Sequence, residues 1–403
     1  MSFESPNNPC PCESGRDYLT CCANPSFTDL QFLHDLTKSR GVASAGTVGT
    51  DSTENNKPLP DVLVHCVNNI NQDPALFPVK VDFLDGSVEL VKMSPYWFSE
   101  STFLDRDRIM GRCAIKADVS WLNDNVDKSR WQSTPFLFHS AFCGSTLMVR
   151  ALELLFDSLP LKESDLLSSL LDYRLSADYE ESTNAEYQAI VMSLLSRRFE
   201  PDQKPVYKAN DLQNAYITSL LDWRDDFPVL LMYCSLNEFI FGCLKTEERK
   251  GWISNRFRYS SLYFKKRFKL DELPELNENA FAEKAAAYWS FNMMLFLEAV
   301  EEFPDRVKTL DFNVMLEDPL SIVKKSGEWL GLKAIDGLNE KYELNWLMGQ
   351  HAKNPGQEYS SAQRQQELED VLNGEGEALQ KAEALARKLL GERYPEHGLP
   401  LKL

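Results

Sequence analysis

Three short candidate strands, two of them apolar, constrain the fold of this chain most strongly, because each of them adjoins a helical pattern. Residues 136–138 and 229–233 are almost wholly apolar, and residues 306–312 form a third candidate strand. Apolar runs of this length are typical of parallel strands that are buried on both faces. Apolar residues at helical spacing follow the first two segments, and a longer helical pattern, residues 280–303, precedes the third. This alternation predicts a three-layer α/β domain with a mainly parallel sheet.

Composition changes along the chain divide it into four predicted regions. Residues 1–25 hold a cysteine cluster, and residues 41–60 are rich in Gly, Ser, Thr and Asn, which is typical of a flexible linker. A short helix is expected near residues 30–37. Residues 61–130 contain a β-hairpin pattern that turns at Asp85-Gly86. Residues 131–403 form the expected α/β domain.

The charge balance bears on partners and location. Lys and Arg total 43 against 61 Asp and Glu, so the net charge is −18. Such a field repels nucleic acid and anionic membranes unless a basic patch intervenes, and no long run of Lys and Arg is present. No nucleic-acid partner is therefore predicted.

The chain has no apolar stretch of about 18 residues and no secretory signal pattern, so we expect no membrane span and a cytoplasmic location.

Four cysteines near the N-terminus predict a metal site. Cys10, Cys12, Cys21 and Cys22 fall within thirteen residues. In a reducing compartment such a cluster indicates metal rather than disulfides, and four thiolates complete a tetrahedral zinc site. Metal would be the main source of stability for so short a segment. We therefore expect a small zinc knuckle with zinc as its cofactor.

This cysteine segment resembles the SEC-C motif, a zinc-binding element found at the C-terminus of the SecA translocation ATPase. The shared pattern is a CxC pair, the Ser14-Gly15 turn, a basic-aromatic stretch and a final CC pair. Glu13 replaces the glycine that usually precedes the serine. The resemblance implies an adaptor that contacts a protein or ribosomal partner and takes no part in catalysis.

Residues 139–146 connect the first apolar strand to its helix and form a candidate anion site. A helix that opens after a strand directs free N–H groups and the positive end of its dipole at a ligand above the sheet. Gly144 allows close approach of the backbone, and Ser145 and Thr146 add hydroxyl donors. The loop lacks the GxxxxGK pattern, which disfavours a kinase or another nucleoside-triphosphate enzyme. An ordinary strand-to-helix turn remains the alternative.

The same loop, HSAFCGSTL, resembles the phosphosulfate-binding loop of bacterial sulfotransferases that use 3′-phosphoadenosine 5′-phosphosulfate (PAPS). The resemblance covers roughly residues 131–390, including the segments 306–332 and 352–356. It implies a P-loop-like fold, a nucleotide sulfate donor and an acceptor that the sequence does not identify. The donor-binding residues that it implies are Ser140, Cys143, Gly144, Ser145 and Thr146.

Two residues depart from the family pattern at the expected 3′-phosphate site, and a third departs from it in the loop. Cys234 and Gly242 stand near the places of the family's arginine and serine, which leaves Ser235 and Lys353 as possible substitutes. Phe142 stands near the place of the loop's basic residue. A catalytically degenerate scaffold, which would act through the zinc motif, is therefore an open alternative to a PAPS-dependent sulfotransferase.

Candidate catalytic residues follow from the same resemblance. Glu163 is the candidate base for the acceptor proton, and Lys162 could neutralise developing charge; an exposed charge pair in a loop is the alternative. Lys208 could reach the sulfuryl group or could be structural. His139 could orient the loop or serve as an alternative base, although a histidine at a strand end is more often a hydrogen-bonded structural residue.

Overall fold

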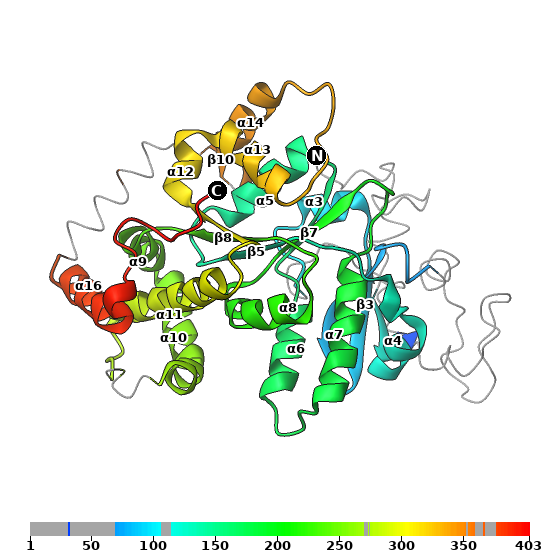
Figure 1. Ribbon diagram of the computed structural model, residues 1–403, viewed down its shortest axis with the longest axis horizontal. Helices are drawn as coiled ribbons and strands as arrows, with labels where there is room; N and C mark the ends of the chain where they lie inside the picture. The colour runs from blue at the N-terminus through cyan, green and yellow to red at the C-terminus, as the bar shows by residue number, and fades with distance from the viewer. Residues whose placement is uncertain are drawn as a thin grey trace. The chain divides into compact units, whose positions relative to one another are not determined.

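The computed structural model describes residues 31–32, 69–105, 114–269, 273, 275–351, 354–358, 366 and 376–403 (Figure 1). The chain divides into two compact units. The first unit comprises Met1–Thr134 and Asp157–Ala209, and the second comprises Pro135–Phe156 and Asn210–Leu403. The zinc knuckle and the linker at 41–60 lie outside the described residues.

A four-stranded sheet with the order β1-β4-β3-β2 organises the first unit. Its strands are β1 (Gln31–Phe32), β2 (Leu76–Asp82), β3 (Ser87–Lys92) and β4 (Ala114–Asp118). The predicted hairpin is confirmed, since β2 and β3 pair antiparallel around a turn in which Gly86 has φ +69°. The helix expected near residues 30–37 is wrong at residues 31–32, because this segment pairs in parallel with β4 and tertiary pairing overrides the local pattern.

The rest of the first unit adds two parallel strands and several helices. Its elements are α3 (Pro95–Glu100), α4 (Val119–Asn125), the 3-10 helix η3 (Lys128–Arg130), β6 (Ser158–Lys162), α6 (Leu166–Leu175), α7 (Glu181–Leu195) and β7 (Lys204–Lys208). The register of β6 and β7 places Lys162 opposite Lys208. Residues 157–209 group with the N-terminal region because α6 packs on β2 and α7 packs on η3. The boundary predicted at residue 130 lies near the division at Thr134, but the sequence places residues 157–209 with the α/β domain.

Three parallel strands organise the second unit. They are β5 (Phe136–His139), β8 (Val229–Tyr233) and β9 (Val307–Asp311), and β8 pairs with both of the others. The helices are α5 (Ser145–Leu155), η4 (Asp211–Tyr216), α8 (Ile217–Trp223), α9 (Leu236–Leu244), α10 (Glu247–Phe268), α11 (Phe281–Glu302), α12 (Phe312–Glu317), α13 (Pro319–Trp329), α14 (Glu340–Met348), α16 (Gly376–Leu390) and η5 (Gly391–Arg393). A two-residue strand β10 (Gln350–His351) pairs with β11 (Asn354–Glu358). The prediction of an α/β fold with parallel strands is confirmed.

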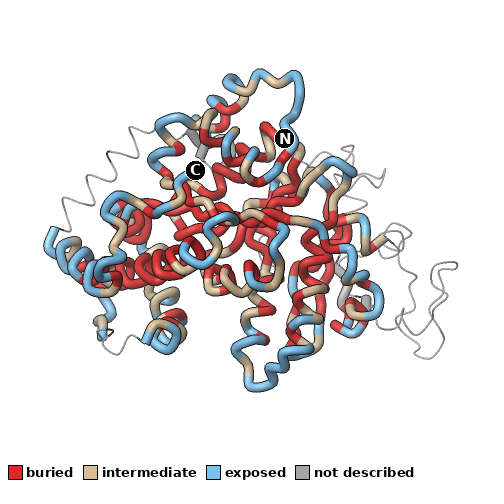
Figure 2. The backbone as a smooth tube through the Cα atoms, in the orientation of Figure 1, coloured by how far each residue is buried: buried red, intermediate tan, exposed pale blue. Residues whose placement is uncertain are grey.

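Helix α11 forms the centre of the second unit. It is buried along nearly its whole length, as Figure 2 shows, and it packs against α9, α10 and α16. The C-terminal segment then returns to the sheet, where the N–H of Leu403 donates to the carbonyl of Thr309 (3.0 Å). This segment covers the free edge of β9 and so reaches the carboxyl ends of the strands.

Candidate functional site

The loop between β5 and α5 contains three residues with a left-handed backbone. Ala141, Phe142 and Gly144 have φ of 66°, 52° and 71°. Such residues turn the chain sharply and direct successive N–H groups to one side, which is a geometry that binds anions. No side chain caps the first turn of α5. The unsatisfied N–H groups and the helix dipole at this end can therefore attract an anion.

Two of the predicted binding residues point into the protein. Ser140 and Cys143 are completely buried, and the Cys143 thiol donates to the carbonyl of Met232 (3.4 Å). The Ser140 hydroxyl donates to the carbonyl of Ala141 (3.4 Å). These side chains hold the loop in shape. The hydroxyls of Ser145 and Thr146 stand on the first turn of α5.

Gly144 lies against an aromatic ring. A Cβ atom at this position would be 2.1 Å from Cε2 of Phe312 on α12. The left-handed backbone and this contact both require glycine. The loop can therefore approach Phe312 only because residue 144 has no side chain.

His139 braces the loop through both its side chain and its backbone. Its Nδ1 accepts a hydrogen bond from the N–H of Ala141 (3.0 Å), and its carbonyl accepts one from Nδ2 of Asn214 (2.9 Å). The side chain is buried. These contacts favour the structural interpretation, and the role of His139 as a base remains a prediction.

Phe142 occupies the space beside Gly242. A Cβ on Gly242 would be 2.6 Å from Cγ of Phe142. The Phe142 ring packs between Phe239 and Trp252, and the guanidinium of Arg249 lies 5.0 Å from its centroid. An aromatic ring thus stands where the resemblance leads us to expect a phosphate contact.

Cys234 and Cys243 are poor nucleophiles. They take part in no disulfide and, like Cys143, are completely buried. Burial raises the pKa of the Cys234 and Cys243 thiols well above the usual range. Since the thiolate is the reactive form, these two thiols stay protonated and inert.

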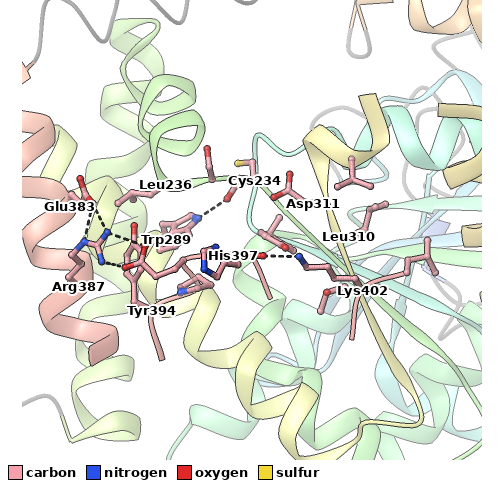
Figure 3. Close-up of a pocket in the computed structure, with 18 residues that line it drawn as sticks. Cys234, Leu236, Trp289, Leu310, Asp311, Glu383, Arg387, Tyr394, His397 and Lys402 are labelled. Atoms are coloured by element: carbon pink, nitrogen blue, oxygen red, sulfur yellow. Dashed lines mark hydrogen bonds and ion pairs between the residues drawn. The ribbon is translucent and has the colours of Figure 1, made fainter. Parts of the chain in front are cut away.

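A pocket of about 520 Å³ lies at the carboxyl ends of β8 and β9 (Figure 3). Asp311 and Lys402 line one side of it, and Trp289, Arg387 and Tyr394 line the other. Burial raises the pKa of Asp311, and the nearby carboxylate of Glu238 on α9 adds to this effect. The pocket therefore has an acidic wall at the strand ends.

Ser235 opens onto this pocket, but its hydroxyl already has partners. It donates to Oε2 of Glu238 (3.0 Å) and accepts from the N–H of the same residue (3.3 Å), which caps α9. A phosphate at Ser235 would meet the Glu238 carboxylate, which repels it. The role of Ser235 in donor binding stays a prediction.

Tyr233 lies at the edge of the pocket and should lower the stability of the fold at alkaline pH. Burial raises its pKa from 10.0 to about 12. Between these values the folded state keeps a proton that the unfolded state loses, so the free energy of unfolding falls as pH rises, by at most about 3 kcal/mol. Urea unfolding at pH 9 and pH 11.5 should show this loss in the wild type and a smaller loss in Tyr233→Phe. Equal losses would contradict the assignment to Tyr233.

In the first unit, Glu163 and Lys208 form a buried ion pair. Their exposed fractions are 9% and 1%, and Glu163 has a left-handed backbone with φ +54°. The Glu163 N–H donates to the carbonyl of Lys208 (2.8 Å), which aligns the ends of β6 and β7. A non-glycine residue that adopts this conformation and belongs to a buried charge pair is typical of a functional site.

Lys162 is also buried, and its Nζ donates to the carbonyl of Ser99 (2.6 Å). The alternative that Lys162 and Glu163 are an exposed charge pair in a loop is therefore wrong. The sequence did not reveal this burial because β6 is short and ends in a charged residue, Lys162, that Glu163 follows.

Several predicted residues lie outside the described part of the chain. They are Cys10, Cys12, Cys21 and Cys22 of the zinc knuckle, and Lys353, which lies between β10 and β11. The residues that the structure describes contain no cluster of His, Cys, Asp and Glu suited to a metal ion. None of the described helices combines the length and the apolar character needed to cross a membrane.

Sequence reasoning missed a buried polar network behind the loop. The Asp211 carboxylate accepts two hydrogen bonds from Arg256 (2.9 and 3.1 Å) and one from the Tyr288 hydroxyl (2.6 Å). The sequence does not reveal this role of Tyr288, because a helical pattern does not show where a hydroxyl points. The network ties η4 to α10 and α11, close in sequence to Asn214, which holds His139.

Comparisons with known proteins yield only distant structural similarity. No protein-family model matches the chain, and no curated protein matches it. The chain is similar to the solved structure of a sulfotransferase from Mycobacterium avium, with 14% identity, a TM-score of 0.34, and coverage of 60% of this chain and 77% of that chain. It is also similar to a sulfotransferase from Alicyclobacillus acidocaldarius, with 16% identity, a TM-score of 0.30, and coverage of 64% and 96%.

Proposed function

We propose that this chain is a cytoplasmic sulfotransferase that moves a sulfuryl group from PAPS to a hydroxyl or amine acceptor. The observation that carries the proposal is the loop between β5 and α5, where left-handed residues lead into a helix without a side-chain cap. This geometry suits an anion and occurs in the segment whose sequence resembles the phosphosulfate loop.

In this proposal the loop binds the donor. The N–H groups at the start of α5 and the hydroxyls of Ser145 and Thr146 would contact the 5′-phosphosulfate, while Gly144 keeps the backbone close to it. Ser140 and Cys143 would act indirectly, because their buried side chains fix the loop. Ser235 and Lys353 remain the candidates for the 3′-phosphate.

The transfer itself is an in-line displacement at sulfur. A bond forms between the acceptor oxygen or nitrogen and sulfur, the bond from sulfur to the 5′-phosphate oxygen breaks, and adenosine 3′,5′-bisphosphate leaves. The Glu163 carboxylate would take the acceptor proton, and Lys208 would hold this carboxylate in place. Lys162, which is bonded to the Ser99 carbonyl, would contribute positive charge near the same strand end.

The test is sulfate transfer from PAPS to a panel of hydroxyl and amine acceptors. We expect turnover with at least one acceptor class, and loss of turnover in Ser145→Ala through weaker donor binding, because one hydroxyl donor is removed. Ser260→Ala is the matched control, since Ser260 is as buried as Ser145 but lies on α10. Absence of both turnover and nucleotide binding would remove the proposal.

A degenerate scaffold is the second candidate. The observation that favours it is the packing of Phe142 beside Gly242, which fills space expected for the 3′-phosphate. In this case the four N-terminal cysteines would hold zinc, and the knuckle would bind a protein or ribosomal partner. Zinc-dependent co-purification of one partner, together with no response to the nucleotide, would support this candidate.

A further inference from the structure

Helix α10 carries an unusual concentration of positive charge. Between Arg249 and Lys269 the sequence has eight Lys and Arg residues and no Asp or Glu, although the whole chain has a net charge of −18. The proposed reaction uses none of these side chains. The positions of these side chains around the helix determine which of them are exposed.

The packing of α10 separates an inner face from an outer face. Ile253, Ser260 and Phe264 are buried, and the Phe264 ring stacks on Phe291 of α11 with centroids 4.3 Å apart. Exposed side chains recur at helical spacing on the opposite side. This outer set, called the α10 stripe below, consists of Arg258, Tyr259, Leu262, Lys265, Lys266 and Lys269.

The basic side chains of the stripe are not neutralised by described neighbours. Three other basic residues of the helix do have carboxylate partners: Lys250 with Glu247, Arg256 with Asp211, and Arg267 with Glu298. No ion pair within the described ranges involves a residue of the stripe. The stripe therefore presents a concentrated positive surface.

Apolar surface lies among these charges. Leu262 is 76% exposed, more than any other large apolar side chain of the described residues, and Tyr259 is 66% exposed. Exposed aliphatic and aromatic side chains between basic ones are typical of helices that lie on a membrane surface. A phosphate backbone of nucleic acid offers no apolar layer for a leucine.

We infer that the α10 stripe binds the surface of an anionic phospholipid bilayer. The lysines give a diffuse, flexible attraction that suits mobile headgroups, Leu262 enters the acyl boundary, and the Tyr259 ring lies at the headgroup level. The negative charge of the rest of the chain does not prevent this, because attraction and repulsion are screened beyond about 8 Å at physiological ionic strength. The inference is independent of the proposed transfer reaction.

The test is co-sedimentation of the full chain with vesicles. We expect binding to phosphatidylcholine vesicles that contain phosphatidylserine, none to pure phosphatidylcholine, and release by high salt. Lys265→Glu/Lys266→Glu should lower the partition coefficient about 10-fold or more. Leu262→Ser should weaken binding without changing its salt dependence. All these side chains are exposed, so circular dichroism should match the wild type.

The matched control is Lys381→Glu/Lys388→Glu on α16, which changes the net charge equally at exposed positions of another helix. It should bind vesicles as the wild type does. Equal weakening by both double variants, or no binding to phosphatidylserine vesicles, would overturn the inference. Binding of a single-stranded oligonucleotide through the stripe, with no vesicle binding, would overturn it in favour of nucleic acid.

Discussion

Glu163→Gln should lose at least about 100-fold in kcat, the usual contribution of a general base. It should also lose about 3–5 kcal/mol of unfolding free energy, because Lys208 is left buried without its charge partner. The affinity for the nucleotide product should not change. The measurements are steady-state kinetics, urea unfolding and calorimetric titration of the same protein samples.

A double variant separates catalysis from stability. In Glu163→Gln/Lys208→Met no unpaired charge remains, so stability should return toward the wild type while turnover stays low. Recovery of turnover together with stability would make Glu163 a structural residue. Glu186→Gln is the control, because its pair with Lys128 is 42% and 30% exposed and should contribute less than about 1 kcal/mol.

Gly144→Ala should destabilise the second unit by about 2–5 kcal/mol and abolish nucleotide binding. A left-handed backbone costs an alanine about 1–2 kcal/mol, and displacement of the Phe312 ring adds about 1–3 kcal/mol. The movement would also shift the N–H groups at the start of α5. Urea unfolding and product titration measure the two effects.

Gly337→Ala isolates the backbone part of this effect. Gly337 has φ +79°, and a Cβ there would meet nothing within 4 Å. It should therefore cost only about 1–2 kcal/mol and leave nucleotide binding intact. If Gly144→Ala behaves like Gly337→Ala, the contact with Phe312 does not shape the loop.

The strands and helices of the second unit could be predicted because their signals are local. The run at residues 229–233 matches β8 from its first residue to its last, and Asp318 caps α13 at Pro319 as its sequence indicates. Strands β6 and β7 gave no such signal. Both are five residues long and begin or end with polar residues, and their burial depends on neighbours that are distant in sequence.

The sequence indicates which residues form the candidate site more readily than it indicates which of them contact one another. The loop and its glycine follow from the strand-to-helix pattern, whereas the pairing of Glu163 with Lys208 joins positions 45 residues apart. The conclusion that no basic patch occurs is wrong for α10. The sequence shows only the short basic segment at residues 265–269, and Arg258, seven positions before Lys265, joins it on the helix surface because of the helical spacing.

Calorimetric titration with adenosine 3′,5′-bisphosphate tests the central claim most directly, because the claim is that the loop before α5 binds the donor nucleotide. We predict saturable binding to the wild type and to Ser260→Ala, and binding weakened about 10-fold or more in Ser145→Ala, which lacks one charge-assisted hydrogen bond. Equal affinity in Ser145→Ala and the wild type, or no binding to any of the three, would contradict the account.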